Sequence, residues 1–353
     1  MHPAIGLLAI SLLSFGCQRA GAEDKAKEAP PKRPDPTALN ERTALLAPIQ
    51  VDSLTLTPIV ATETGMPTQD VDVMVLDEAF GQKLVAIKEN ESESVNHLTL
   101  TNKSSRPLFM LAGEVIIGGK QDRIIGQNTI IAANTTQVVP VFCVEHGRWD
   151  QSSTVFTSGK ALAHGRLRGQ ASFENQGEVW REVAAKNALR KTENSTDTYR
   201  QVATQQSNGT LAVSEKQVNA AIAKLAPVER ARMIGYVIAL NGKVATVDMF
   251  NSPKLFRKLE DKLVKSYLTE SIDTPADKNI QPPTVADVKA FMSDADKAVA
   301  EKSYENPTAS TVRFKGDKSA KAKVHLKEAD GADDSMSKSP KKPAVYETYQ
   351  KMK

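Results

Sequence analysis

Residues 108–150 read LFMLAGEVIIGGKQDRIIGQNTIIAANTTQVVPVFCVEHGRWD, and they carry the main fold signal of this chain. Short apolar runs rich in β-branched residues alternate with Gly-Gly and Ala-Asn turn signals, which predicts a series of short strands. Charged and polar residues gather around the first turn and after the last strand. Such groups at the ends of a rigid sheet are the usual components of a site. We therefore expect the loops near Gln121 and Arg148 to meet in a common pocket.

The sequence on either side of this stretch predicts an α+β protein. Between Ile49 and Val144, apolar runs of strand length recur at short spacing and predict roughly seven or eight strands, as in antiparallel sandwiches and barrels. After Trp149 the apolar spacing becomes helical, for example in residues 178–191. We expect an antiparallel β-rich sandwich or barrel-like N-terminal half with a helical C-terminal half packed on it.

Local signals predict several element boundaries in the C-terminal half. Asn241-Gly242 lies between two β runs and predicts a type I′ hairpin turn. Ser252, followed by proline, predicts the start of a long helix, and Thr284 predicts the start of another. Ser214, with glutamine three residues later, predicts a capping box at the start of a third helix.

The N-terminal residues have the composition of an export signal. Residues 3–16 form an apolar run of the length of a signal-peptide core, which is short for a bilayer span. Gly16-Cys17 resembles the end of a lipobox, so we expect lipidation of Cys17 and a bacterial lipoprotein of the cell envelope, at the outer membrane or in the periplasm. The alternative is cleavage after Ala22, which leaves a soluble periplasmic or secreted protein.

Composition divides the chain into four expected parts. Residues 23–45, rich in charge, Ala and Pro, should be a flexible tether behind a signal peptide over 1–22. Residues 46–310 are long enough for a single α+β domain. Residues 311–353 are expected to form a charged loop, with strand-like islands at 310–314 and 322–326 and a candidate strand at its end.

Charge and cysteine content exclude several classes of function. The formal net charge is +4 with mixed signs along the chain, so no basic stripe supports nucleic-acid binding. Contact with a membrane is expected through the lipid anchor alone. Without Cys17, Cys143 is the only cysteine, so an intramolecular disulfide is excluded. No histidine spacing typical of zinc sites is present, and the sequence identifies neither a cofactor nor an oligomeric state.

Two segments of the central stretch resemble a known family. Residues 113–123, GEVIIGGKQDR, and residues 139–149, VPVFCVEHGRW, are similar to the signature of the ARG and rhodanese-phosphatase-superfamily-associated protein family. The likeness continues through 176–192 and 235–250 and covers most of residues 46–275. The resemblance implies a domain of unknown function, and the family's name links it to ADP-ribose-handling enzymes only by association.

Polar residues of the two loops form a candidate anion-binding set. Arg123 and Arg148 carry guanidinium forks that suit a phosphate or a carboxylate, Lys120 adds charge, and Gln121 would set orientation. Trp149 is a candidate stacking platform for a base or sugar ring, although tryptophan at such positions also packs in cores and rims. The competing interpretation is that these cations are ordinary surface charges.

Glu114 and Glu145 are the candidate acid and base. Paired carboxylates support hydrolysis of a sugar-phosphate or ADP-ribose-like bond. Glu114 follows an apolar run, where a carboxylate needs a partner, so a structural ion pair with Arg123 or Arg148 is the alternative. Cys143 lies inside an apolar run, and we expect a buried, inert thiol there.

Two functions are consistent with these residues. The first is an extracytoplasmic, lipid-anchored domain that binds an anionic small molecule, such as a phosphorylated sugar, a nucleotide or an ADP-ribose-like compound, with hydrolysis if the protein is an enzyme. The alternative is a non-catalytic cell-envelope interaction or scaffold protein whose polar residues form a structural network. Charged groups that face an open cleft favour the first, and mutually saturated buried pairs favour the second.

Overall fold

The computed structural model describes residues 35–67, 72–90, 95–150, 155–327, 335–336 and 343–352. These residues form three β-sheets and eight α-helices, and the N-terminal half is mostly strand. The α+β prediction is confirmed. The expected signal peptide and residues 23–34 of the expected tether lie outside the described residues. The end of that tether is not flexible, because residues 37–38 and 43–45 form strands of the largest sheet. None of the described helices combines the length and the apolar character that crossing a bilayer requires.

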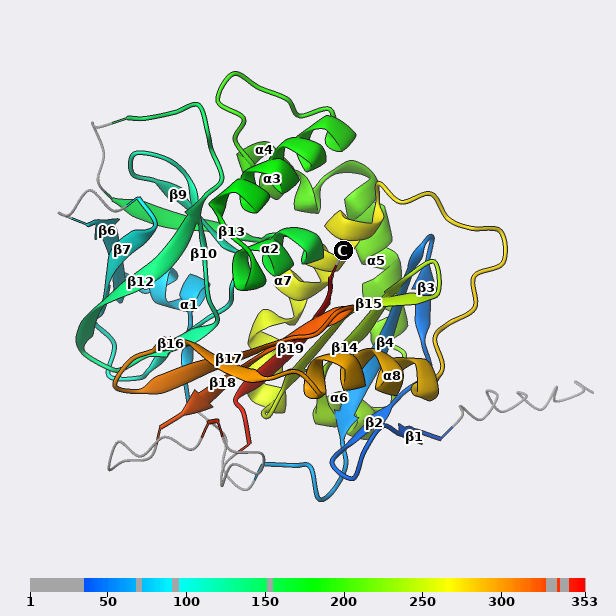
Figure 1. Cartoon of the computed structure of the whole chain (residues 1–353). Coiled ribbons are helices and arrows are strands. Elements are labelled where there is room, and N and C mark those ends of the chain that lie inside the picture. Colours follow the sequence, from blue (N-terminus) through cyan, green and yellow to red (C-terminus); the bar gives the residue numbers. More distant parts are fainter. Residues whose placement is uncertain are drawn as a thin grey trace, which may run out of the picture. The chain divides into compact units, whose positions relative to one another are not determined.

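The largest sheet takes its ten strands from both ends of the described chain (Figure 1). Its paired strands are all antiparallel. Across the sheet the order is β1 (Thr37–Ala38), β2 (Thr43–Leu45), β4 (Leu54–Ala61), β14 (Met233–Leu240), β15 (Lys243–Phe250), β19 (Tyr346–Lys351), β18 (Ser319–Leu326), β17 (Ala309–Lys315) and β16 (Ala300–Glu305), and β3 (Ile49–Val51) pairs with β4.

The hairpin between β14 and β15 has the turn that the sequence predicts. Asn241 and Gly242 both have positive φ, 47° and 75°, as a type I′ turn requires. A Cβ at residue 242 would lie 2.5 Å from the carbonyl oxygen of Gln281, so the close approach of that loop also requires glycine. The turn sets the register of β15 on β14.

The large sheet continues past residue 310, where a charged loop was expected to begin. In β18, alternate alanine and valine residues are buried. Lys321, between them, places its ammonium 4.5 Å from the ring centroid of Tyr349 and pairs with Asp296 at 2.7 Å. A lysine stem can cover an aromatic ring while its charge finds a partner, so a lysine-rich segment still forms a strand. The boundary expected at residue 310 therefore falls inside the sheet.

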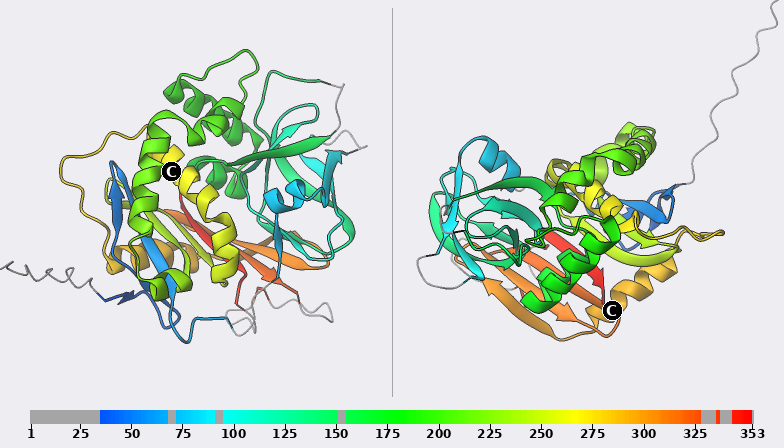
Figure 2. Two further views of the ribbon diagram at one scale, coloured as in Figure 1. Left: turned by 180° about the vertical axis from the view of Figure 1, so that it is seen from behind. Right: turned by 90° about the horizontal axis from the view of Figure 1, so that it is seen from above.

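Helices cover both faces of this sheet (Figures 1 and 2). α7 (Pro253–Ser271) and α5 (Gly209–Ile222) share an apolar core with β4 and β14, whereas α8 (Val285–Asp296) packs in a second core with β15 and β19. Apolar side chains point to both faces of the central strands, which explains their nearly continuous burial.

The helix starts predicted in this half are partly confirmed. Ser252 caps α7 by accepting a hydrogen bond from the Leu255 N–H, and Thr284 caps α8. The capping box predicted at Ser214 is wrong, because α5 begins at Gly209 and Ser214 is buried within the helix. The apolar face of α5 already starts at the buried Leu211, so the hydroxyl does not mark its beginning.

The two smaller sheets form a barrel-like layer that shares one apolar core. The six-stranded sheet has the order β13 (Phe156–Leu162), β9 (Glu114–Gly118), β10 (Arg123–Ile125), β12 (Thr135–Cys143), β7 (His97–Asn102) and β6 (Val85–Glu89). The three-stranded sheet has the order β11 (Thr129–Ile131), β8 (Leu108–Met110) and β5 (Met74–Val75), and α1 (Leu76–Gly81) follows β5.

A group of helices covers the other face of the six-stranded sheet. α2 (Gly165–Phe173), α3 (Gln176–Arg190) and α4 (Arg200–Thr204) pack there against β9, β10 and β13. The short helices η1 (Gln205–Ser207) and α6 (Pro227–Arg232) precede α5 and β14. Because β9, β10 and β13 have apolar side chains on the face that these helices cover, the charged residues of this part of the sheet lie near the strand ends.

A buried ion pair joins α2 to the large sheet. Arg168 donates to both carboxylate oxygens of Asp248, at 3.0 and 3.2 Å, and the hydroxyls of Tyr267 and Tyr346 donate to the same carboxylate. Neither side chain of the pair is more than 2% exposed. Burial alone would raise the pKa of Asp248, but the Arg168 charge and the hydroxyl donors outweigh it and hold that pKa below its usual range.

Replacing Asp248 by Asn should lower the free energy of unfolding by about 3–5 kcal/mol, because the buried Arg168 charge loses its counter-charge. Because the folded pKa of Asp248 is lowered, the parent should lose this contribution as the pH falls below about 4, the unfolded pKa. Denaturant unfolding measured at several pH values tests both effects.

The matched control is Asp261→Asn, because this carboxylate is 69% exposed and pairs with Lys265 on the helix surface. Its effect should stay within about 0.5 kcal/mol. Equal effects of the two substitutions at neutral pH would contradict a structural role for Asp248.

Candidate functional site

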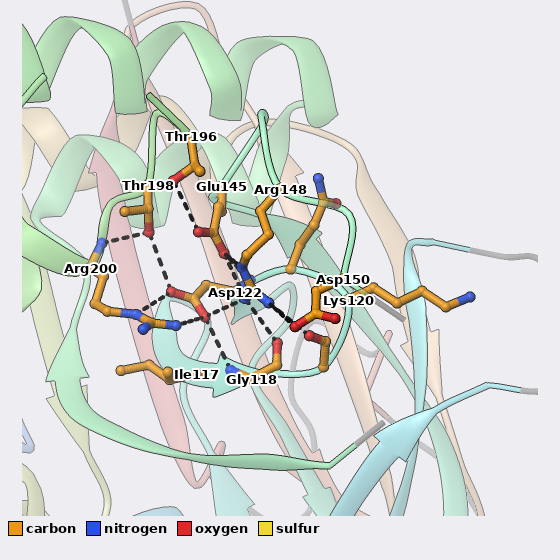
Figure 3. A network of polar contacts seen from close by, with 12 residues as sticks. Ile117, Gly118, Lys120, Asp122, Glu145, Arg148, Asp150, Thr196, Thr198 and Arg200 are labelled. Atoms are coloured by element: carbon orange, nitrogen blue, oxygen red, sulfur yellow. Dashed lines mark hydrogen bonds and ion pairs between the residues drawn. The ribbon is translucent and has the colours of Figure 1, made fainter. Parts of the chain in front are cut away.

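Three loops meet at one end of the six-stranded sheet (Figure 3). β10 pairs with β9 on one side and with β12 on the other, so residues 119–122 and the residues after Cys143 emerge next to each other. The Gln121 side chain donates to the His146 carbonyl oxygen at 3.3 Å, which places the two predicted loops in contact. The third loop, residues 191–199 between α3 and α4, closes over them.

The Asp122 carboxylate is the centre of this arrangement. It is buried and accepts hydrogen bonds from the Gly118 N–H at 3.1 Å, the Thr198 hydroxyl at 3.3 Å and Arg148 at 3.2 Å. Arg200 adds two further bonds, at 2.8 and 2.7 Å, one to each carboxylate oxygen. A buried carboxylate needs such a set of donors, because a lone pair that loses its hydrogen bonds to water and gains none from the protein destabilises the folded state.

Glu145 links the first two loops from the other side. Its Oε2 accepts the Asp122 N–H at 3.0 Å and the Arg148 Nε at 2.7 Å, and its Oε1 accepts the Thr196 hydroxyl at 3.1 Å. The side chain is 5% exposed. Both carboxylate oxygens of this predicted acid or base are therefore engaged by donors from the protein.

Arg148, Lys120 and Trp149 form the outer rim of the network. Arg148 also donates to the Gly119 carbonyl oxygen at 3.0 Å and is 23% exposed. The Lys120 ammonium lies 5.0 Å from the ring centroid of Trp149, and Trp149 itself is half exposed. These two residues present an aromatic and cationic surface to solvent rather than a closed binding cleft.

Arg123 and Gln121 lie beneath this rim. Arg123 is fully buried and donates to the Gln121 side-chain oxygen at 3.3 Å. Its guanidinium lies 3.9 Å from Glu89, which is an ion pair without a hydrogen bond. The Nε and Nη2 atoms of Arg123 have no hydrogen-bond partner among the described residues. Within the described part of the chain, Arg123 is the member of the predicted set whose unmet donors are buried.

Glu114 lies at the opposite end of β9, away from Glu145. The two ends of this strand, Glu114 and Gly118, are separated by roughly 13 Å at the usual rise per residue. Glu114 is buried, accepts the Leu111 N–H at 2.9 Å and pairs with Lys262 of α7 at 2.7 Å. Burial raises the pKa of Glu114, although the Lys262 charge opposes that shift. The structure does not bring the two candidate carboxylates to one reacting centre.

The remaining candidate groups are packed in the interior or on the helices. Cys143 is 1% exposed, and burial raises the pKa of its thiol although Arg123 lies nearby. The His146 ring meets the Trp180 ring edge to face, with centroids 4.5 Å apart. Within the described residues, His, Cys, Asp and Glu side chains form no group of three that is arranged to hold a metal ion.

The sequence did not indicate the third loop. Arg200 lies 78 residues after Asp122, and Thr196 and Thr198 stand in a polar segment without a recognisable motif. The sequence contains one indirect signal for this loop. If Asp122 is buried, its carboxylate requires cationic or hydroxyl partners from elsewhere in the chain.

The Asp122 and Glu145 carboxylates are saturated, and three cavities of the structure lie elsewhere. Cavities of about 240, 580 and 380 Å³ are lined by residues of the large sheet and its helices, and none of the predicted site residues lines any of the three. Chemically, the arrangement holds three loops together by charge, and both oxygens of Asp122 and of Glu145 already accept hydrogen bonds from the protein.

Comparison with known proteins gives one match. The family model described as the ARG and Rhodanese-Phosphatase-superfamily-associated Protein domain matches residues 42–334. No curated protein and no solved structure matches the chain.

Replacing Asp122 by Asn should lower the free energy of unfolding by about 3 kcal/mol, because the change removes the charge that faces two arginines and places an NH2 group against their donors. Urea unfolding followed by circular dichroism measures the loss. Asp150→Asn is the matched control, since its carboxylate is 44% exposed and 4.0 Å from Arg148. That control should change stability by less than about 0.5 kcal/mol. A loss below about 1 kcal/mol for Asp122→Asn would contradict a structural role of the network.

Proposed function

From the premise that the chain belongs to the ARG and Rhodanese-Phosphatase-superfamily-associated Protein family, we propose that it is a non-catalytic interaction or scaffold module of the cell envelope. In this proposal the charged residues of its two central motifs are structural. They hold three loops in one arrangement, and the exposed rim of that arrangement contacts a partner.

The saturation of the Asp122 and Glu145 carboxylates is the observation that supports this proposal. A general acid or base must reach the proton that it transfers, with an atom free to do so. Both carboxylates accept bonds from arginine, hydroxyl and backbone donors, and Glu114 is paired with Lys262 on the far side of the sheet. Residues that are engaged in this way suit a rigid frame better than a reacting centre.

The rim beside the network has the composition of a contact surface. Trp149 is half exposed and is held under the Lys120 ammonium. Tryptophan provides a large, rigid contact area and is enriched in the energetically dominant positions of interfaces. A rigid frame below such a residue keeps it presented to a partner.

The location in the envelope is proposed from the sequence alone. The apolar run 3–16, the Gly16-Cys17 pair and the charged, proline-containing segment 23–36 together fit a lipid anchor followed by a spacer. A spacer of this kind would hold the folded module away from the membrane surface.

One observation favours the second candidate function, an anionic ligand site. The buried guanidinium of Arg123 has two N–H groups without a hydrogen-bond partner among the described residues. A phosphate or carboxylate oxygen would satisfy such donors. Arg123 is fully buried, so this site would require the network above it to open.

A ligand titration separates these two functions. Inorganic phosphate, ribose 5-phosphate and ADP-ribose should shift the unfolding midpoint of the parent no more than that of an Arg123→Met variant. A ligand at 100 times its Kd would raise the free energy of unfolding by about 2.7 kcal/mol, which a thermal or denaturant scan detects readily. Lys103→Met, at an exposed position away from the network, is the control for lost charge. Saturable stabilisation that survives in Lys103→Met and disappears in Arg123→Met would overturn the proposal in favour of the ligand site.

Fractionation of the expressing cells tests the anchor. With its own leader in a bacterial host, the parent should require detergent for release from the membrane fraction, and Cys17→Ala should appear in the soluble extracytoplasmic fraction, because a lipid chain supplies the membrane affinity. Mass spectrometry of the mature N-terminus provides the readout. A soluble parent that begins at an unmodified Glu23 would contradict the lipoprotein proposal.

A further inference from the structure

A cavity lies between α2 and the end of the large sheet, outside the charge network. Its volume is about 380 Å³, within the usual range for small-molecule sites. It is bounded by α2, the β14–β15 hairpin, the C-terminal end of α7 and the end of β19, segments that lie together around the C-terminus in Figure 1. The lining residues used below are Gly165, Gly169, Lys243, Thr246, Glu270 and Lys351.

Two glycines of α2 keep this cavity open. Gly165 and Gly169 are one helical turn apart, and neither has a positive φ. A Cβ at Gly165 would lie 3.5 Å from the Thr246 hydroxyl oxygen, and a Cβ at Gly169 would lie 3.8 Å from the nearest atom. Both are ordinary contact distances. Glycine destabilises a helix relative to alanine, and here neither backbone conformation nor packing requires it, so its effect is to leave space over the cavity.

The charged groups around the cavity carry both signs. One oxygen of Glu270 accepts the Arg166 N–H at 2.9 Å, and the other has no partner among the described residues. Lys243 and Lys351 are exposed where the hairpin and β19 line the cavity, and neither forms an ion pair with a carboxylate of the described chain. The lysines disfavour a simple cation in the cavity, and Glu270 disfavours a simple anion.

The polar groups at the base of the cavity are already paired with each other. The Thr246 hydroxyl donates to the Gln350 side-chain oxygen at 3.0 Å, and the Gln350 amide donates to Thr348 at 3.1 Å. The side-chain oxygen of Gln170, another lining residue, is buried and has no hydrogen-bond partner among the described residues, so it adds one neutral acceptor. The charged groups left for recognition are Glu270 and the two lysines, and a ligand that satisfies both signs must carry an ammonium and a carboxylate.

We propose that this cavity binds a small zwitterion, a free amino acid or a short peptide, with its ammonium at Glu270 and its carboxylate at Lys243 and Lys351. The ligand side chain then lies over Gly165 and Gly169, where the helix has no side chains of its own. This binding site is separate from the Asp122 network, so the proposal stands or falls independently of the proposed function.

Calorimetric titration of the full chain with L-alanyl-L-alanine tests the proposal. The parent should bind the dipeptide saturably, and Gly169→Leu should weaken that binding at least tenfold, because the new side chain occupies the cavity. Ala185→Leu, which places the same side chain at an exposed position of α3, should bind like the parent. Absence of saturable binding to the parent, or unchanged binding by Gly169→Leu, would overturn the proposal.

A second set of variants avoids any packing change. Glu270→Gln retains an acceptor for the Arg166 N–H but removes the charge, and Lys243→Gln with Lys351→Gln removes both exposed cations. Each change should weaken dipeptide binding at least tenfold, and N-acetyl-L-alanyl-L-alanine amide, which lacks both charges, should bind neither parent nor variant. Equal binding of the capped and uncapped dipeptides by the parent would refute recognition of a zwitterion.

Discussion

The buried carboxylate of Asp122 sets the constraint on which this end of the molecule depends. A buried carboxylate must be surrounded by donors, and the five hydrogen bonds to Asp122 come from four residues in three separate parts of the chain: Gly118, Arg148, and Thr198 with Arg200. The chain can satisfy Asp122 only when the three loops are in place together. The electrostatic requirement of one side chain therefore determines the arrangement of loops that are 78 residues apart.

The same principle operates at the other contacts between layers. Arg168 and Asp248 join α2 to the large sheet, and Glu114 and Lys262 join β9 to α7. In each case the two elements pack through apolar surfaces and also share one buried ion pair. Breaking the pair is strongly destabilising, and the two charges meet only when the elements are in one relative position. Charged residues at the ends of apolar strands, which resemble catalytic groups in the sequence, here specify how the layers dock.

Local sequence patterns predicted the elements but not the partners of the charged residues. The Asn241-Gly242 turn and the cap at Ser252 depend on neighbouring residues, so the sequence shows them directly. The cap expected at Ser214 was wrong because burial, rather than the hydroxyl, determines where α5 starts. Arg200 was missed because its link to Asp122 is tertiary, and no periodicity or spacing encodes it. Only residues 322–326 of β18 were expected to be strand-like, because lysines alternate with small alanines at the start of the strand and mask its apolar period.

Native-state hydrogen exchange at the Asp122 and Lys120 amides tests most directly whether the charge network is closed in solution. These two N–H groups donate to carboxylates, Asp122 to Glu145 at 3.0 Å and Lys120 to Glu89 at 2.7 Å, so they exchange only when the network opens. A structural network predicts opening free energies within about 1 kcal/mol of the global free energy of unfolding. Exchange at the rate of an unstructured peptide would show that the loops open freely, and it would contradict a structural role for these residues.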